Sequence, residues 1–186
     1  MSALARIPPP APPAVVDAGR LARRRRAALR ARGRSDNHDW FRNIASARFV
    51  LRRAFRIIEE HARAAGLDPL AHQALIQVYG SAANSLRVKD LADRLDISQA
   101  FASGLIGTLV GRGLVQRQRG ATDLREIRLA ATPAGIALLT RIDAAVQTEV
   151  DAFTASLPAD EKEAALSILT FYVGVALADP AAALQG

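Results

Sequence analysis

The sequence predicts a mainly α-helical fold with a small β-sheet of two or three strands. Two observations support this prediction. From residue 39 onward, apolar residues recur over long stretches at alternating three- and four-residue steps, which is the period of one helix face. Residues 114–119 and 126–130 instead alternate apolar and polar side chains on either side of a short segment, which indicates a β-hairpin. At 186 residues, half of them apolar, the chain can bury one sizeable core.

Composition excludes several classes of protein. No apolar run approaches the ~20 residues that span a bilayer, and the first residues lack the order of a secretory signal, so we expect no membrane partner and a cytoplasmic, nucleoid-associated protein. Without cysteine there is no disulfide, thiolate metal site or thiol redox sensor. The three histidines, His38, His61 and His72, are too scattered to indicate zinc. We therefore expect neither a metal nor a cofactor.

The net charge of +7 is unevenly distributed. Residues 1–36 hold nine arginines against two aspartates and so account for all of it. Residues 85–130 contain eight basic and five acidic residues, whereas residues 131–186 contain two basic and seven acidic ones. A basic middle suits contacts with phosphate, and an acidic end is better suited to packing or solubility.

Residues 1–36 are expected to form a flexible Pro/Arg-rich basic arm, because the prolines of residues 7–13 prevent regular structure. This arm is either a solvated tail, an additional contact to phosphate or a docking segment, or the product of a misassigned start. The helical region of residues 37–66 and 132–180 is expected to form a dimer. Residues 67–131 are expected to form a separate domain between these helices.

The first helix of the body is predicted from Asp39, as its cap, to Gly66. Its apolar face would comprise Phe41, Ile44, Arg48, Leu51, Phe55, Ile58 and Ala62. A second helix begins at Asp68-Pro69 and ends near Gly80.

The basic middle is predicted to contain two short helices joined by a tight turn. Residues 88–96 form the first helix, Ser98 caps the second, and the second extends over residues 99–113. Leu105, Ile106 and Leu109 of this second helix would face the core. Its outer face would be formed by Gln99, Ala100, Ser103 and Thr108.

Two further helices are predicted after the hairpin. A long helix opens at Thr132-Pro133 and breaks at Leu157-Pro158, and a last helix covers about residues 159–178. From Ala164 this last helix is apolar nearly all round, which favours burial against a partner surface. The simplest partner is a second copy of the chain.

Residues 40–178 resemble the MarR family of bacterial transcription regulators. The segment DLADRLDISQAFASGLIGTLVGRGLV, residues 90–115, is similar to the family's reading head. Asp123, Arg125, Thr132 and Gly135 stand at the spacing of the family's wing pattern, with Ala131 where leucine is usual. The resemblance implies a winged helix-turn-helix with N- and C-terminal dimerisation helices. A departure is the set of helix-interior glycines Gly104, Gly107 and Gly111, which either allow close approach to DNA, leave the helix frayed until it binds, or relieve crowding against the hairpin.

The resemblance implies a homodimeric regulator of transcription, usually a repressor, that binds a pseudo-palindromic operator in double-stranded DNA. The helix that begins after Ser98 would enter the major groove, and the wing would contact phosphate and the minor groove. The implied DNA-binding residues are Ser98, Gln99, Ala100, Ser103, Thr108, Arg117, Arg119, Asp123 and Arg125. Each side chain on the helix could instead simply face solvent, and the strand arginines could lie on a solvated edge.

Family members often release DNA when a small acid binds. Arg48 lies on the apolar stripe of the first helix, where a charge needs an anionic partner. That partner is either an acidic residue such as Glu149 or Asp151, or an effector held with help from Trp40, Arg52 and His72; Arg48 could also extend its head group to solvent. An anionic effector would be an aromatic acid or an acyl-CoA.

The sequence also bears on two other classes of function. An enzyme is disfavoured because the sequence has no nucleophile elbow, phosphate-binding glycine loop or paired catalytic carboxylates. A winged-helix adaptor that binds protein and no operator is the alternative, and the glycine-rich reading helix is its best support.

Overall fold

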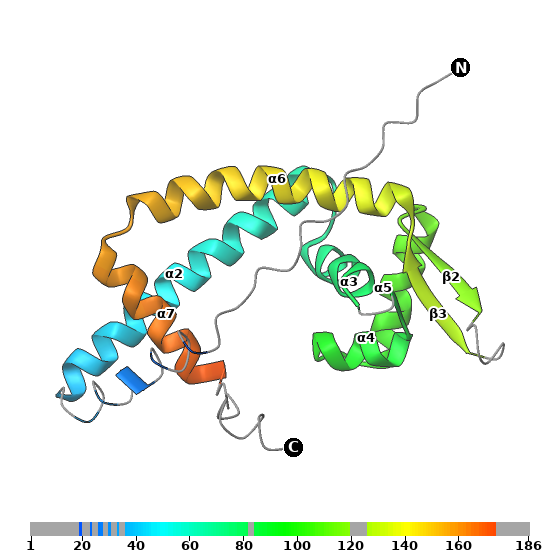
Figure 1. Ribbon diagram of the computed structural model, residues 1–186. Coiled ribbons are helices and arrows are strands. Elements are labelled where there is room, and N and C mark those ends of the chain that lie inside the picture. Colours follow the sequence, from blue (N-terminus) through cyan, green and yellow to red (C-terminus); the bar gives the residue numbers. More distant parts are fainter. Residues whose placement is uncertain are drawn as a thin grey trace. The chain divides into compact units, whose positions relative to one another are not determined.

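The computed structural model describes residues 36–81, 84–119 and 126–173, together with the separate helical positions Gly19, Arg23, Arg26, Ala27, Arg30 and Gly33. Figure 1 shows its elements. They are helix α2 (Asn37–Ala64), helix α3 (Pro69–Tyr79), strand β1 (Ser85–Leu86), helix α4 (Val88–Leu95), helix α5 (Gln99–Gly111), strands β2 (Val115–Arg119) and β3 (Ile127–Ala131), and helices α6 (Pro133–Ser156) and α7 (Ala159–Val173). The predicted fold class, mainly α with a small sheet, is confirmed. Most of the predicted arm lies outside the described residues.

The chain divides into two compact units, which are treated separately below. One unit is formed by residues 49–158 and contains α3 to α6, all three strands and the end of α2. The other joins the described residues up to Arg48 with those from Ala159 onward. Within the described part of the chain, no helix has both the length and the apolar character that crossing a membrane requires.

The three strands form an antiparallel sheet in the order β1, β3, β2. Ser85 pairs with Ala130 on one side, and Val115 pairs with Ala131 on the other. Helix α3 packs against α4, α5, α6, β1 and β3 and is therefore the central element of this unit. The core around it is apolar and buried, and includes Leu75, Val78, Leu91, Ile106, Leu109, Leu129 and Ile142.

Local sequence explains where α2 and α3 end and begin. Gly66 adopts a φ of +74°, a left-handed conformation that glycine tolerates best, and ends α2 as predicted. Oδ1 of Asp68 accepts hydrogen bonds from the amides of Leu70 and Ala71, at 2.9 and 3.3 Å, and so caps α3. The expected cap at Asp39 was wrong by one turn, because Oδ1 of Asp36 accepts from the Asp39 amide at 2.8 Å and α2 already begins at Asn37.

The predicted apolar face of α2 is buried only in part, at Ala62 and, less deeply, at Ile44, Leu51 and Ile58. Ala47, Ile57 and Ala62 are the fully buried residues of this helix, whereas Phe41 and Phe55 are 64% and 58% exposed. Arg48 is exposed too, so the premise that its charge is buried does not hold. The stripe was identified from the three- and four-residue spacing of apolar residues alone. That spacing does not show which side of the helix packs against the core of the same chain.

Candidate DNA-binding and ligand-binding sites

The helix-turn-helix is formed by α4 and α5. Helix α4 ends at Asp96, which adopts the left-handed conformation with a φ of 53°, and the Ile97 amide donates back to the Ala92 carbonyl at 3.1 Å. Ser98 then adopts an extended conformation, and its Oγ accepts a hydrogen bond from the Phe101 amide at 3.2 Å. The predicted cap is confirmed, and it fixes the direction in which α5 leaves the turn.

The outer face of α5 has the predicted composition. Ser98, Gln99, Ala100, Ser103 and Thr108 are all exposed, while Ile106 and Leu109 are buried and Leu105 is half-buried. The hydroxyl groups of Ser103 and Thr108 donate to the carbonyls of Gln99 and Gly104, at 2.9 and 3.3 Å. These hydroxyls therefore offer acceptor lone pairs to DNA, and Gln99 offers both a donor and an acceptor.

The glycines of α5 lie on open positions. A Cβ atom added at Gly104, Gly107 or Gly111 would meet no atom of its surroundings within 4 Å. The possibility that these glycines relieve crowding against the hairpin therefore finds no support in the described residues. With only hydrogen beyond the backbone, this side of α5 can approach a neighbouring surface closely.

The wing is described in part. Arg117 and Arg119 are exposed on β2, on the strand face that begins with the buried Val115. Asp123 and Arg125 lie in residues 120–125, which fall outside the described residues. Their expected roles in the wing therefore stay predictions.

A cluster of charged side chains joins β1 and β3 at the opposite sheet edge. Arg128 donates from Nε to Ser85 Oγ at 2.9 Å and pairs with Glu126 at 3.0 Å. Nε and Nη2 of Arg87 both donate to the carboxylate of Asp90 at 2.8 Å, which lowers the pKa of Asp90. Arg87 and Arg128 therefore form ion pairs with acidic residues of the same chain. Arg117 is exposed on the other outer strand.

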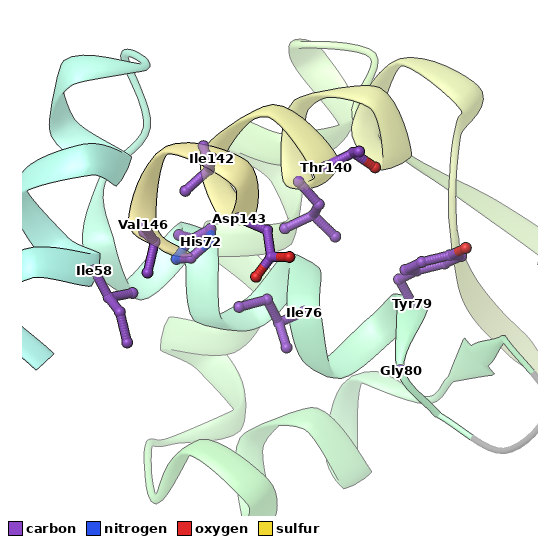
Figure 2. A pocket seen from close by; sticks show the side chains of 10 residues that line it. Ile58, His72, Ile76, Tyr79, Gly80, Thr140, Ile142, Asp143 and Val146 are labelled. Atoms are coloured by element: carbon purple, nitrogen blue, oxygen red, sulfur yellow. The ribbon is translucent and has the colours of Figure 1, made fainter. Parts of the chain in front are cut away.

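A cavity of about 350 Å³ lies between α2, α3 and α6 of the larger unit (Figure 2). Ile58 from α2, His72, Ile76 and Tyr79 from α3, and Asp143 and Val146 from α6 are among its lining residues. His72, Ile76 and Tyr79 are spaced by four and three residues and so share one face of α3. This volume is in the range of small-molecule sites in proteins.

The polar side chains among the lining residues are those of His72, Tyr79, Thr140 and Asp143. Asp143 extends from α6 toward α3, above Ile76 in the view of Figure 2. His72 is 4% exposed. Burial lowers the pKa of His72 below its ordinary value of 6.5, and the negative charge of Asp143 opposes this effect. The imidazole is therefore uncharged at neutral pH.

The four residues predicted to bind an effector are divided between the two units. Of them, only His72 lines the cavity. Arg52 is exposed, and Trp40 and Arg48 belong to the other unit. Glu149, one of the suggested partners of Arg48, accepts from His61 at 2.9 Å and lies 3.5 Å from Arg53.

One group of potential metal ligands was not expected from the sequence. Asp36, His38 and Asp39 offer ligand atoms within 4.8 Å of one another at the start of α2. Asp36 already caps this helix, and Asp39 pairs with Arg42 at 2.7 Å. The carboxylates are thus accounted for by the helix terminus.

Sequence reasoning also missed Phe101 and Asp143. Phe101 is 56% exposed in the first turn of α5, next to the expected base-contacting residues. It lies one position before the buried Ala102. Asp143 could not be recognised, because its site combines residues from three separate helices.

Comparison with known proteins agrees with this geometry. The family model described as MarR family matches residues 65–126, which cover the helix-turn-helix and β2. No curated protein sequence matches the chain significantly.

Solved structures share the fold at low identity. MarR from E. coli is 21% identical with a TM-score of 0.56, covering 68% of this chain and 91% of that one. A variant of MepR from S. aureus, bound to an oligodeoxyribonucleotide, is 17% identical with a TM-score of 0.52, over 75% of this chain and 98% of MepR. BpsR from Bordetella bronchiseptica, whose DNA binding is regulated by 6-hydroxynicotinic acid, is 20% identical with a TM-score of 0.53, over 68% and 94%.

Solved structures with this fold include proteins described as transcription regulators. Residues 65–126 of this chain thus match the model of the MarR family, and the chain shares the fold of the solved MarR structure.

Proposed function

We propose that this protein is a homodimeric, sequence-specific repressor that releases its operator when a small molecule enters the cavity between α2, α3 and α6. The observation that supports DNA binding most directly is α5, whose capped N-terminus presents exposed polar and small side chains beside a basic strand. An α-helix fits the major groove, where each base pair has a distinct pattern of donors and acceptors.

Each predicted DNA contact has a defined role in this proposal. Gln99 forms a bidentate pair with adenine, Ala100 meets a thymine methyl, and Ser103 and Thr108 accept hydrogen bonds from bases or from water. Arg117 and Arg119 contact phosphate, Arg125 lies in or beside the minor groove, and Asp123 holds the wing loop. The oligodeoxyribonucleotide bound to MepR supports this assignment by analogy of fold.

A dimer follows from exposed apolar side chains at the helices outside the reading head. Phe41, Phe49 and Phe55 on α2 and Leu166 and Leu169 on α7 are large, apolar and exposed. Burying such side chains against a second copy removes them from water, and two copies of α5 then read two half-sites. A pseudo-palindromic operator is the expected DNA partner.

Helix α3 links the cavity with the reading head. One of its faces lines the cavity, and the helix also packs against α4 and α5. A ligand that moves α3 therefore shifts the elements that position α5, and it favours the DNA-free state if it binds that state more tightly. The effect of 6-hydroxynicotinic acid on BpsR supports the idea that such a fold responds to a small molecule.

A mobility shift with the DNA upstream of the protein's own gene tests DNA binding. We would compare the full chain with Gln99→Ala, Arg117→Ala and Arg125→Ala at two salt concentrations. Arg56→Ala is the matched control, because Arg56 is an exposed arginine on α2 that is paired with Glu60. We expect a sequence-selective shift that weakens steeply with salt through release of counterions.

The variants separate base reading from phosphate contact. Gln99→Ala should weaken specific binding by about 1–3 kcal/mol and leave binding to random DNA unchanged. Arg117→Ala should weaken both and reduce the salt dependence, whereas Arg56→Ala should behave like the parent. If specific and random DNA bind alike in every variant, the operator-binding function is rejected and the winged-helix adaptor takes its place.

A further inference from the structure

The ionisable groups of the cavity determine which ligands it accepts. Among the described residues that line it, the ionisable side chains are those of His72, Tyr79 and Asp143. Neither lysine nor arginine is among them. A negatively charged ligand would thus meet the Asp143 carboxylate without a cation to balance it.

The buried histidine does not supply the missing positive charge. His72 is buried against apolar neighbours, and burial lowers its pKa, so at neutral pH its ring offers a lone pair on one nitrogen. His72 and Asp143 can therefore both accept hydrogen bonds from a ligand. A protonated amine is the group that donates to both and also neutralises Asp143.

The remaining lining is suited to an apolar body. Ile58, Ile76, Leu139, Ile142 and Val146 surround the space with branched aliphatic side chains, and Tyr79 adds an aromatic ring at the end of α3. Burial of apolar ligand surface against these residues supplies affinity, while the charged end supplies orientation.

We propose that the effector of this protein is a small lipophilic amine whose ammonium group pairs with the Asp143 carboxylate and whose apolar part lies between α2, α3 and α6. The assignment rests on the proposed function, because it names the class of ligand for the same cavity. It replaces the anionic effector expected from Arg48, which is exposed and lies in the other unit. Asp143 acts as the counter-ion and His72 as a second acceptor.

Two ligands with the same ring and opposite charge test this proposal. Naphthylmethylamine and naphthoic acid would be titrated into the full chain by calorimetry at neutral pH, with benzoyl-CoA as an acyl-CoA probe. The variants are Asp143→Asn, which removes the charge at nearly constant shape, and Asp143→Glu, which keeps the charge. The matched control is Asp151→Asn, because Asp151 is another exposed aspartate of α6 that does not line the cavity.

We expect the amine to bind more tightly than the acid, and Asp143→Asn to weaken amine binding about tenfold, which corresponds to the loss of one partly solvated charge pair. Asp143→Glu should retain amine binding, and Asp151→Asn should leave it unchanged. Acid binding should not weaken in Asp143→Asn. Tighter binding of naphthoic acid or benzoyl-CoA to the parent, or amine binding that is insensitive to Asp143→Asn, would overturn the proposal. Circular dichroism of each variant checks that it is folded.

Release of labelled operator DNA, measured by fluorescence anisotropy, separates this proposal from the proposed function. If the amine binds with the expected dependence on Asp143 but the free protein binds no operator, the ligand assignment stands and the repressor function fails. If the operator binds and the acid alone releases it, the repressor function stands and the ligand assignment fails.

Discussion

Thr132 and Gly135 illustrate how single residues hold the wing to the long helix. Oγ1 of Thr132 donates to the Gly113 carbonyl at 2.6 Å and accepts from the Gly135 amide at 3.1 Å. The Thr132 amide in turn donates to the Leu114 carbonyl at 3.0 Å. One threonine thus caps α6 and ties it to the turn between α5 and β2, which explains physically why this residue type suits the position.

Gly135 is required by space rather than by backbone conformation. A Cβ atom at this position would overlap the carbonyl oxygen of Leu114, and backbone cannot move aside as a flexible side chain can. We expect Gly135→Ala to lower the free energy of unfolding by about 1–3 kcal/mol, as overpacking does. Urea denaturation followed by circular dichroism measures this.

The matched control for Gly135 is Gly107→Ala. No atom lies within 4 Å of the added methyl group there, so alanine should raise the free energy of unfolding by about 0.5–1 kcal/mol. Equal effects of the two substitutions would contradict the role given to the Leu114 carbonyl.

His72 should make stability depend on pH. Its pKa in the folded state lies below the ordinary value of 6.5, so in acid the unfolded chain binds a proton that the folded chain does not. The free energy of unfolding should therefore fall as pH decreases through 6.5 and stop falling once the lower folded-state pKa is passed. The neighbouring Asp143 carboxylate from α6 reduces this effect without reversing it.

His72→Gln should remove that part of the pH dependence, because glutamine keeps a polar side chain but binds no proton in this range. Urea denaturation of both proteins at a series of pH values would measure the difference. A difference in stability that does not change with pH would show that His72 contributes through packing alone.

At the scale of the element, α5 is a regular helix from Gln99 to Gly111 in spite of its glycines. Because added methyl groups at Gly104 and Gly107 would project into open space, we favour close approach to DNA as the role of these glycines. Gly104→Ala should then raise stability while weakening operator binding. Thermal unfolding and fluorescence anisotropy of the same preparation compare the two effects, and operator binding that strengthens along with stability would support a frayed helix instead.

The sequence predicted individual elements better than their contacts. Asp68, Ser98 and Thr132 were recognised as starts of helices because a cap bonds to amides two or three residues away, so the information is local. The exposed face of α5 was predicted because Ile106 and Leu109 mark the opposite side. The buried face of α2 was predicted only in part, and of the expected effector-binding residues only His72 lines the cavity, because both features depend on which distant helices meet.

Arg48 shows how a functional prediction fails when the contacts between distant helices are not known. Its place on an apolar stripe suggested a buried charge that needs an acidic residue or an anionic ligand as its partner, but Arg48 is exposed. The cavity that the packing creates contains Asp143 in place of an arginine. The ligand that we propose for this cavity therefore has a charge opposite to that expected from Arg48.

At the scale of the whole molecule, the exposed phenylalanines of α2 are the side chains whose substitution tests whether the protein is a dimer. Phe55 is 58% exposed, and Phe49 stacks edge to face on Phe153 of α6 at 6.5 Å while remaining 59% exposed. We expect Phe55→Glu to dissociate the proposed dimer, because it would place a charge in an apolar interface without a partner. Sedimentation velocity at several concentrations measures the mass of the species.

The same variant connects assembly with function. A monomer has one copy of α5 and loses the second half-site, so operator binding should fall much more than binding to random DNA. Phe55→Leu is the control, because leucine keeps an apolar side chain and should remain dimeric with operator affinity close to that of the parent. If Phe55→Glu remained a dimer with unchanged operator binding, the interface would have to lie elsewhere, and the exposed leucines of α7, Leu166 and Leu169, would be the next positions to change.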